Sequence, residues 1–192
     1  MNKSLVGITV CAVVIVGGFL ILNSGAHNEK KTPVETDYKN AEYVIEGKRI
    51  KLIDGVAETE VAPGAATKII TRYFGNELIT DLDGDGRKDV AFILTQEPGG
   101  TGTFFYAVAA LNTEHGYVGS DAYLLGDRIA PQTTELSTNP RHDHVVVFNY
   151  ADRGPGEPMS AQPSVAKSVY LKLNPTSMQW GVVKPNFEGE SR

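Results

Sequence analysis

From Ala41 onward, short apolar runs alternate with clusters of turn residues, and this pattern constrains the fold more than any other feature of the chain. No stretch in this part keeps a helical period over about ten residues, whereas each run has the length of a strand. Short strands joined by turns are typical of sandwiches and barrels. We therefore predict an all-β fold, a single antiparallel sandwich or barrel-like domain over residues 41–192, with strands at 41–46, 49–53, 67–73, 77–80, 89–95, 103–111, 122–125, 144–150, 165–173 and 179–183.

Three of these runs are apolar without alternation: residues 90–94, 104–111 and 145–148. A strand with one face in water alternates between apolar and polar side chains, because successive side chains point to opposite faces. We therefore expect the three runs to lie centrally, with both faces covered. Since a plain two-layer sandwich leaves its outer faces in water, a barrel, an extra layer or a binding partner is implied. The alternative is an ordinary thick core.

The N-terminal part of the sequence predicts a membrane segment. Leu5 to Leu22 is an uncharged apolar run that would be about 27 Å long as a helix, close to the roughly 30 Å of a hydrocarbon core. We expect residues 1–26 to be a signal-anchor with a transmembrane helix at 5–22; the alternative is a signal peptide cleaved after Ala26. Residues 27–40 are polar and form the expected linker. We expect the β domain outside the cell membrane, because the short tail before the apolar run resembles an export signal.

The formal net charge of −5 argues against nucleic-acid binding, and the single Cys argues against an internal disulfide. Nucleic acid is bound through clustered Lys and Arg, so we do not expect this acidic chain to bind it. One Cys cannot form a disulfide within its own chain, and Cys11 lies inside the apolar N-terminal run. The partners that we expect are the membrane, through the N-terminal helix, and an envelope protein or a polysaccharide, through the β domain.

One segment carries the residues of a metal site. Asp81, Asp83, Asp85 and Asp89 stand at positions 1, 3, 5 and 9 of a loop, the spacing from which calcium takes its oxygen ligands. Arg87 at position 7 would supply its backbone carbonyl and leave its side chain in solvent. Without a cation, four carboxylates in so short a segment repel one another. The sequence therefore predicts a Ca²⁺ site at these residues.

The flanks of this loop distinguish it from the helical EF-hand. Position 12 is Phe92, where the EF-hand has a bidentate Glu, and both flanking segments are expected to be strands. Residues 79–91 closely resemble the strand–loop–strand calcium loop of FG-GAP repeats, the blades of integrin-α-type propellers. The resemblance implies a loop that binds calcium structurally. It extends to the loop alone, because a propeller needs several blades and the sequence has no second copy of this segment.

A wider resemblance covers most of the chain. The N-terminal anchor, the acidic loop at 81–89 and the segments at 99–104 and 149–159 are similar to an uncharacterised group of membrane-anchored bacterial envelope proteins. That group has no assigned activity. The resemblance therefore implies an architecture and a location, and no reaction.

Four other side chains offer an alternative function, that of an envelope hydrolase. His142 and His144 could place two imidazoles on one strand face, and Asp152 and Glu157 flank a turn of Gly and Pro and could act as paired acids. The ordinary alternative is a polar strand start for the first pair and a surface ion pair for the second. Our leading hypothesis is therefore a non-catalytic, membrane-anchored extracytoplasmic β domain with one structural calcium site. A hydrolase would instead bring these groups together in one concave pocket.

Overall fold

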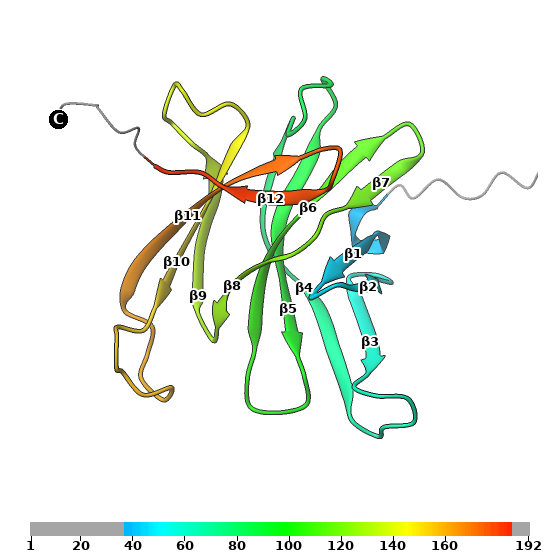
Figure 1. Cartoon of the computed structure of the whole chain (residues 1–192), viewed down its shortest axis with the longest axis vertical. Coiled ribbons are helices and arrows are strands. Elements are labelled where there is room, and N and C mark those ends of the chain that lie inside the picture. The colour runs from blue at the N-terminus through cyan, green and yellow to red at the C-terminus, as the bar shows by residue number, and fades with distance from the viewer. Residues whose placement is uncertain (1–36, 186–192) are drawn as a thin grey trace, which may run out of the picture. The chain divides into compact units, whose positions relative to one another are not determined.

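The computed structural model describes residues 37–185, which form an all-β domain with a single short 3-10 helix (Figure 1). The predicted signal-anchor at 1–26 and the first part of the predicted linker lie outside the described residues. Among the residues described, no helix has the length and apolar character needed to cross a membrane. The elements in chain order are η1 Tyr38–Asn40, β1 Glu42–Ile45, β2 Lys48–Lys51, β3 Val56–Glu60, β4 Lys68–Thr80, β5 Asp89–Glu97, β6 Phe104–Thr113, β7 Gly116–Gly119, β8 Tyr123–Asp127, β9 Ala130–Leu136, β10 Val145–Asp152, β11 Val165–Asn174 and β12 Gln179–Val182.

These strands pair antiparallel in three sheets. The largest has the order β3-β4-β5-β6-β7, and β8 pairs with the part of β6 that β7 leaves free. A four-stranded sheet has the order β12-β11-β10-β9, and β1 and β2 form a separate hairpin. The prediction of an all-β, antiparallel fold is thus confirmed.

The sheets form three layers, because the large sheet is covered on both faces (Figure 1). On one face, Ala91, Ile93 and Ala107 share a core with Phe148 and Leu171 of the four-stranded sheet. Alternate residues of the same strands point to the other face, where they pack against the β1–β2 hairpin. This second core includes Val90, Phe92, Leu94, Tyr106 and Val108 from the large sheet and Tyr43, Ile45 and Ile50 from the hairpin.

The second core explains the apolar runs that do not alternate. Residues 90–94 of β5 and 105–111 of β6 are buried without a break, because each strand contributes side chains to both cores. The ring of Tyr43 meets that of Phe92 edge-on at 5.6 Å between centroids. The extra layer that these runs implied is therefore the N-terminal hairpin of the domain itself. Residues 145–148 of β10, the third run, are buried as well.

Several boundaries differ from the prediction. The strands expected at 67–73 and 77–80 are one long strand, β4, whose register shifts near Gly75. Gly75 and Asn76 both have positive φ, so the turn residues seen in the sequence produce an irregularity within a strand and no reversal of the chain. Tyr38, in the segment predicted as linker, packs against the second core, so that η1 is part of the domain.

Candidate metal centre

The acidic loop, residues 81–89, connects β4 to β5 and brings three of its four aspartates together. Asp81, Asp83 and Asp89 each place a carboxylate oxygen within 4.8 Å of the other two. Asp81 and Asp83 are partly exposed, whereas Asp89, the first residue of β5, is fully buried. The three carboxylates that converge stand at positions 1, 3 and 9 of the predicted calcium loop.

Backbone amides inside the loop hold these carboxylates in place. Asp81 accepts hydrogen bonds from the amides of Gly84 and Gly86, at 2.7 and 2.9 Å. Both glycines have a φ near +85°, a conformation that costs other residues free energy. Glycine at these two positions therefore lets the loop turn tightly enough for its amides to reach Asp81. These hydrogen bonds, the first from Gly84, lower the pKa of Asp81 below its usual value. Asp81 is therefore held ionised as well as oriented.

Asp89 has a different environment. Its two carboxylate oxygens accept hydrogen bonds from the amides of Leu82 and Asn112, both at 2.8 Å, which tie the loop to the end of β6. Burial raises the pKa of Asp89, and the nearby carboxylates of Asp83 and Asp85 raise it further, against the lowering effect of the two amides. Both donors are neutral, so the ionised form of Asp89 gains hydrogen bonds here but no positive partner among residues 37–185.

Asp85 and Arg87 are arranged differently from the prediction. The guanidinium of Arg87 forms an ion pair with the carboxylate of Asp85, and its Nε donates a hydrogen bond to the carbonyl oxygen of Asn112. The side chain of Arg87 is exposed, as expected, and in addition fastens the loop to β6. Because Asp85 is paired in this way, it stands apart from the cluster of Asp81, Asp83 and Asp89. A basic residue so close in sequence to an aspartate was the available signal for this pair.

His144 also touches the acidic loop, a contact that the spacing of residues in the sequence does not predict. Its Nδ1 lies 2.8 Å from the carbonyl oxygen of Asp81, and since a carbonyl only accepts, Nδ1 carries the proton and donates. His144 precedes β10, so this hydrogen bond joins the loop of the large sheet to the four-stranded sheet. No local pattern could have indicated a contact between residues so distant in sequence.

The four groups considered for a hydrolase do not converge. His142 contacts Ser137 through Nδ1 and the carbonyl oxygen of Lys184 through Nε2, whereas His144 faces the acidic loop. Asp152 is the last residue of β10, about 26 Å from His144 at the rise of an extended strand, and Glu157 lies in the loop that follows. There the carboxylate of Asp152 pairs with Lys167.

Glu157 has a local role within its own loop. Its carboxylate accepts a hydrogen bond from the amide of Gly154, at 2.7 Å. The two histidines therefore lie at one end of the four-stranded sheet, and the two acids lie at the other. Each of the four side chains contacts a different partner near its own end. The arrangement gives a hydrolase based on these residues no common pocket.

Comparison of the chain with models of protein families, with curated proteins and with solved structures finds no match. The resemblances to the FG-GAP calcium loop and to the envelope group thus rest on the residues quoted for them.

Proposed function

We propose that this protein is a calcium-stabilised binding module, in which the acidic loop holds one structural Ca²⁺ ion. The observation that carries the proposal is the convergence of Asp81, Asp83 and Asp89, whose carboxylate oxygens lie within 4.8 Å of one another. Calcium binds oxygen at about 2.3–2.6 Å, so two ligands of one ion are separated by no more than about 5 Å. The spacing of the three oxygens is therefore compatible with a shared calcium ion.

The chemistry of the loop favours calcium over other metals. Carboxylates and backbone carbonyls are hard oxygen ligands, which suit calcium and magnesium and suit zinc or copper less well. Magnesium demands nearly ideal octahedral geometry and keeps several waters, whereas calcium accepts six to eight oxygens in a flexible arrangement. The sequence spacing predicts that Asp85 and the carbonyl of Arg87 complete the ligand set. When calcium binds, the carboxylate of Asp85 would leave its ion pair with Arg87 and coordinate the ion.

Neutralising the buried carboxylate would be the physical role of the ion. Asp89 is fully buried, and its pKa is raised by that burial and by the neighbouring carboxylates. A divalent cation at the centre of the cluster would turn this repulsion into attraction. It would also lock the loop between β4, β5 and β6, which form the middle of the large sheet. The effect expected of calcium is therefore on stability and on the order of this end of the domain.

We propose further that the β domain is held outside the cell by its N-terminal anchor and acts by binding an envelope protein or a polysaccharide. The separation of His142 and His144 from Asp152 and Glu157 favours binding over the alternative of a hydrolase. The apolar character of Leu5 to Leu22 supports the anchor.

Thermal unfolding of the full chain in EDTA and in calcium tests the proposal. A ligand that binds only the native state stabilises it by about 1.4 kcal/mol when its concentration is tenfold above its Kd. For a domain of this size we expect the melting temperature to rise by roughly 3–6 °C between EDTA and about 10 mM calcium. Magnesium at the same concentration is the control for a general effect of divalent salt. Identical melting curves in EDTA and in calcium would contradict the proposal.

A further inference from the structure

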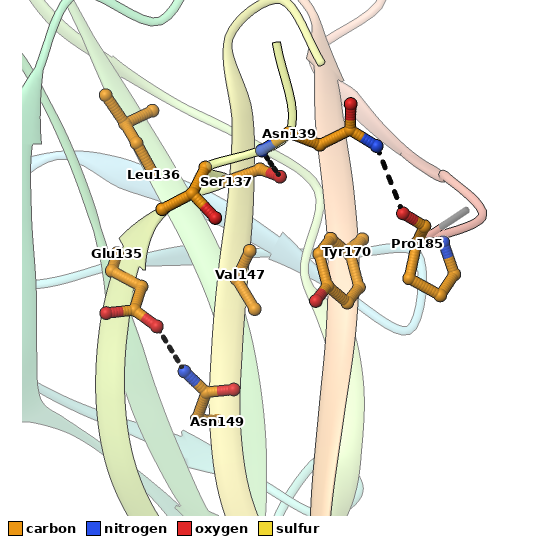
Figure 2. Close-up of a pocket in the computed structure, with 9 residues that line it drawn as sticks. Glu135, Leu136, Ser137, Asn139, Val147, Asn149, Tyr170 and Pro185 are labelled. Atoms are coloured by element: carbon orange, nitrogen blue, oxygen red, sulfur yellow. Dashed lines mark hydrogen bonds between the residues drawn. The ribbon is translucent and has the colours of Figure 1, made fainter. Parts of the chain in front are cut away.

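The outer face of the four-stranded sheet carries a hollow of about 260 Å³, and no residue of the acidic loop lines it (Figure 2). Its lining comes from three neighbouring strands: Glu135 on β9, Val147 and Asn149 on β10, and Tyr170 on β11. The rim is formed by Ser137 to Asn139, in the segment between β9 and β10, and by Pro185. The hollow is thus built on paired strands, which hold its walls at fixed spacing.

The floor of the hollow is the apolar side chain of Val147. Val147 points away from the core between the sheets, yet it is only 4% exposed. It lies directly between Glu135 and Tyr170, because both are its partners in the strand register. Figure 2 shows the ring of Tyr170 between Val147 and Pro185. Asn139 closes the rim by donating from its side-chain amide to the carbonyl oxygen of Pro185, at 3.2 Å.

The polar groups around this floor form an ordered network. Asn149 donates from its side-chain amide to Glu135 and to Thr133, both at 2.9 Å, and accepts a hydrogen bond from the hydroxyl of Ser168. Asn149 thereby fixes the carboxylate of Glu135, which has further lone pairs available to a ligand. The ring of Tyr170 also meets the ring of His142 edge-on, at 5.7 Å between centroids.

We propose that this hollow binds one ring of a neutral sugar, as part of an oligosaccharide or polysaccharide. A sugar ring offers hydroxyls that both donate and accept hydrogen bonds and C–H groups that pack against apolar and aromatic surface. The hollow offers a carboxylate, an amide and hydroxyls around a valine and a tyrosine.

The charge of the hollow favours a neutral sugar over anionic ligands and polycations. The carboxylate of Glu135 disfavours phosphate, carboxylate and other anions, because like charges repel. A single carboxylate that already accepts from an amide is a weak basis for binding a polycation. Thr133, Asn149 and Ser168 lie side by side on the three strands, in the next outward-facing row after Val147. They extend the polar surface, so that a longer sugar chain has further contacts.

This inference names a ligand class for the proposed binding role and does not depend on the calcium site. The test measures binding of the full chain, in a detergent without sugar head groups, to cellohexaose, maltohexaose and the hexamer of N-acetylglucosamine by isothermal titration calorimetry. An oligomer of galacturonic acid is the anionic comparison. We expect at least one neutral hexamer to bind and the acidic oligomer not to bind.

Variants locate the binding. Glu135→Gln keeps the oxygen that accepts from Asn149 but loses the charge, and we expect affinity to fall about tenfold or more. Tyr170→Ala should abolish binding, and Tyr170→Phe, which keeps the packing of the ring, should weaken it less. Glu114→Gln, in the exposed turn between β6 and β7, is the matched control and should bind as the native protein does.

Three results would overturn the inference: no binding of any neutral hexamer at millimolar concentration, binding that Glu135→Gln and Tyr170→Phe leave unchanged, or preference for the acidic oligomer. Repeating the titration in EDTA keeps the two proposals apart. If no neutral hexamer binds but calcium raises the melting temperature as expected, the sugar site alone is contradicted. If calcium leaves the melting temperature unchanged but a neutral hexamer binds, the metal site alone is contradicted.

Discussion

Replacing Asp83 by Asn separates the charge of the acidic loop from its hydrogen bonds. Asp83 accepts a hydrogen bond from the amide of Asp85 at 3.1 Å, and the side-chain oxygen of Asn can accept the same bond. Asp83→Asn therefore keeps the shape of the loop and removes one of three carboxylates within 4.8 Å of one another. We expect the substitution to stabilise the metal-free protein and to remove its response to calcium.

The size of the first effect follows from the spacing of the charges. Two unit charges about 4.8 Å apart repel by about 0.9 kcal/mol in water and by about 3.5 kcal/mol at an effective dielectric constant of 20. Asp83 is partly exposed, so the lower end of this range applies, and we expect a gain of about 1 kcal/mol in EDTA. The native protein should gain about 1.4 kcal/mol at a tenfold excess of calcium over Kd, and the variant close to nothing.

Differential scanning calorimetry of both proteins, in EDTA and in calcium, measures the two effects together. Asp54→Asn, in the exposed turn before β3, is a matched control that should leave the calcium response unchanged. If Asp83→Asn is destabilised in EDTA and keeps the full increment in calcium, the carboxylates shape the loop and hold no ion. That result would refute the reasoning.

Three further predictions concern the domain around the site. Asp89→Asn should lower the free energy of unfolding by about 1–3 kcal/mol even in EDTA, since one of the two amides that donate to the buried carboxylate loses its acceptor; chemical denaturation checks this, and a gain in stability would contradict it. Phe92→Ala should cost about 3–5 kcal/mol in the same assay, because the ring is fully buried under the N-terminal hairpin against Tyr43, and a loss below about 1 kcal/mol would mean that the hairpin is not a true layer. Asp152→Asn should cost less than about 1 kcal/mol at pH 7, because its ion pair with Lys167 is partly exposed. The hydrogen bond from Lys167 lowers the pKa of Asp152 in the folded state, so this contribution is present above about pH 4, the unfolded value, and is lost as the pH falls through the folded value. Unfolding of both proteins at pH 7 and at pH 2 measures the difference, and a gap that persists at pH 2 would contradict the assignment.

The centre of the fold could be predicted from the sequence, because a strand that is buried on both faces has apolar residues without polar alternation. Residues 90–94 and 104–111 lack polar alternation, and the structure places them between two cores. The sequence also indicated that something must cover the second face. That this layer is the β1–β2 hairpin depends on packing between segments distant in the chain, which no local pattern records.

The edges of the sheets could not be predicted in the same way. β3 and β9 are at least partly exposed and mostly polar, so they lack the apolar signal by which strands are recognised, and β9 contains Pro131 near its start. β4 was predicted as two strands because Gly75 and Asn76 are typical of turns. In the structure, pairing with β5 on both sides of this irregularity keeps the strand continuous.

The acidic loop shows the same division between local and distant contacts. The spacing of the four aspartates predicted that all of them would meet, and Asp81, Asp83 and Asp89 do, since the loop is local and its glycines set its shape. Asp85 instead pairs with Arg87, two residues further along the chain. The hydrogen bond from His144 comes from the segment before β10, which is distant in sequence and gives no local signal. The hollow at Tyr170 is assembled from three strands and leaves no mark in any one of them.

A calcium titration of the isotope-labelled full chain, followed through its backbone amide resonances, tests the central claim most directly. We expect saturable shifts concentrated at residues 81–89 and at Asn112, whose amide donates to Asp89, with a Kd in the range of about 10⁻⁴ to 10⁻³ M. Shifts that never saturate, or that are spread over exposed carboxylates elsewhere in the domain, would show that the acidic loop binds no specific ion.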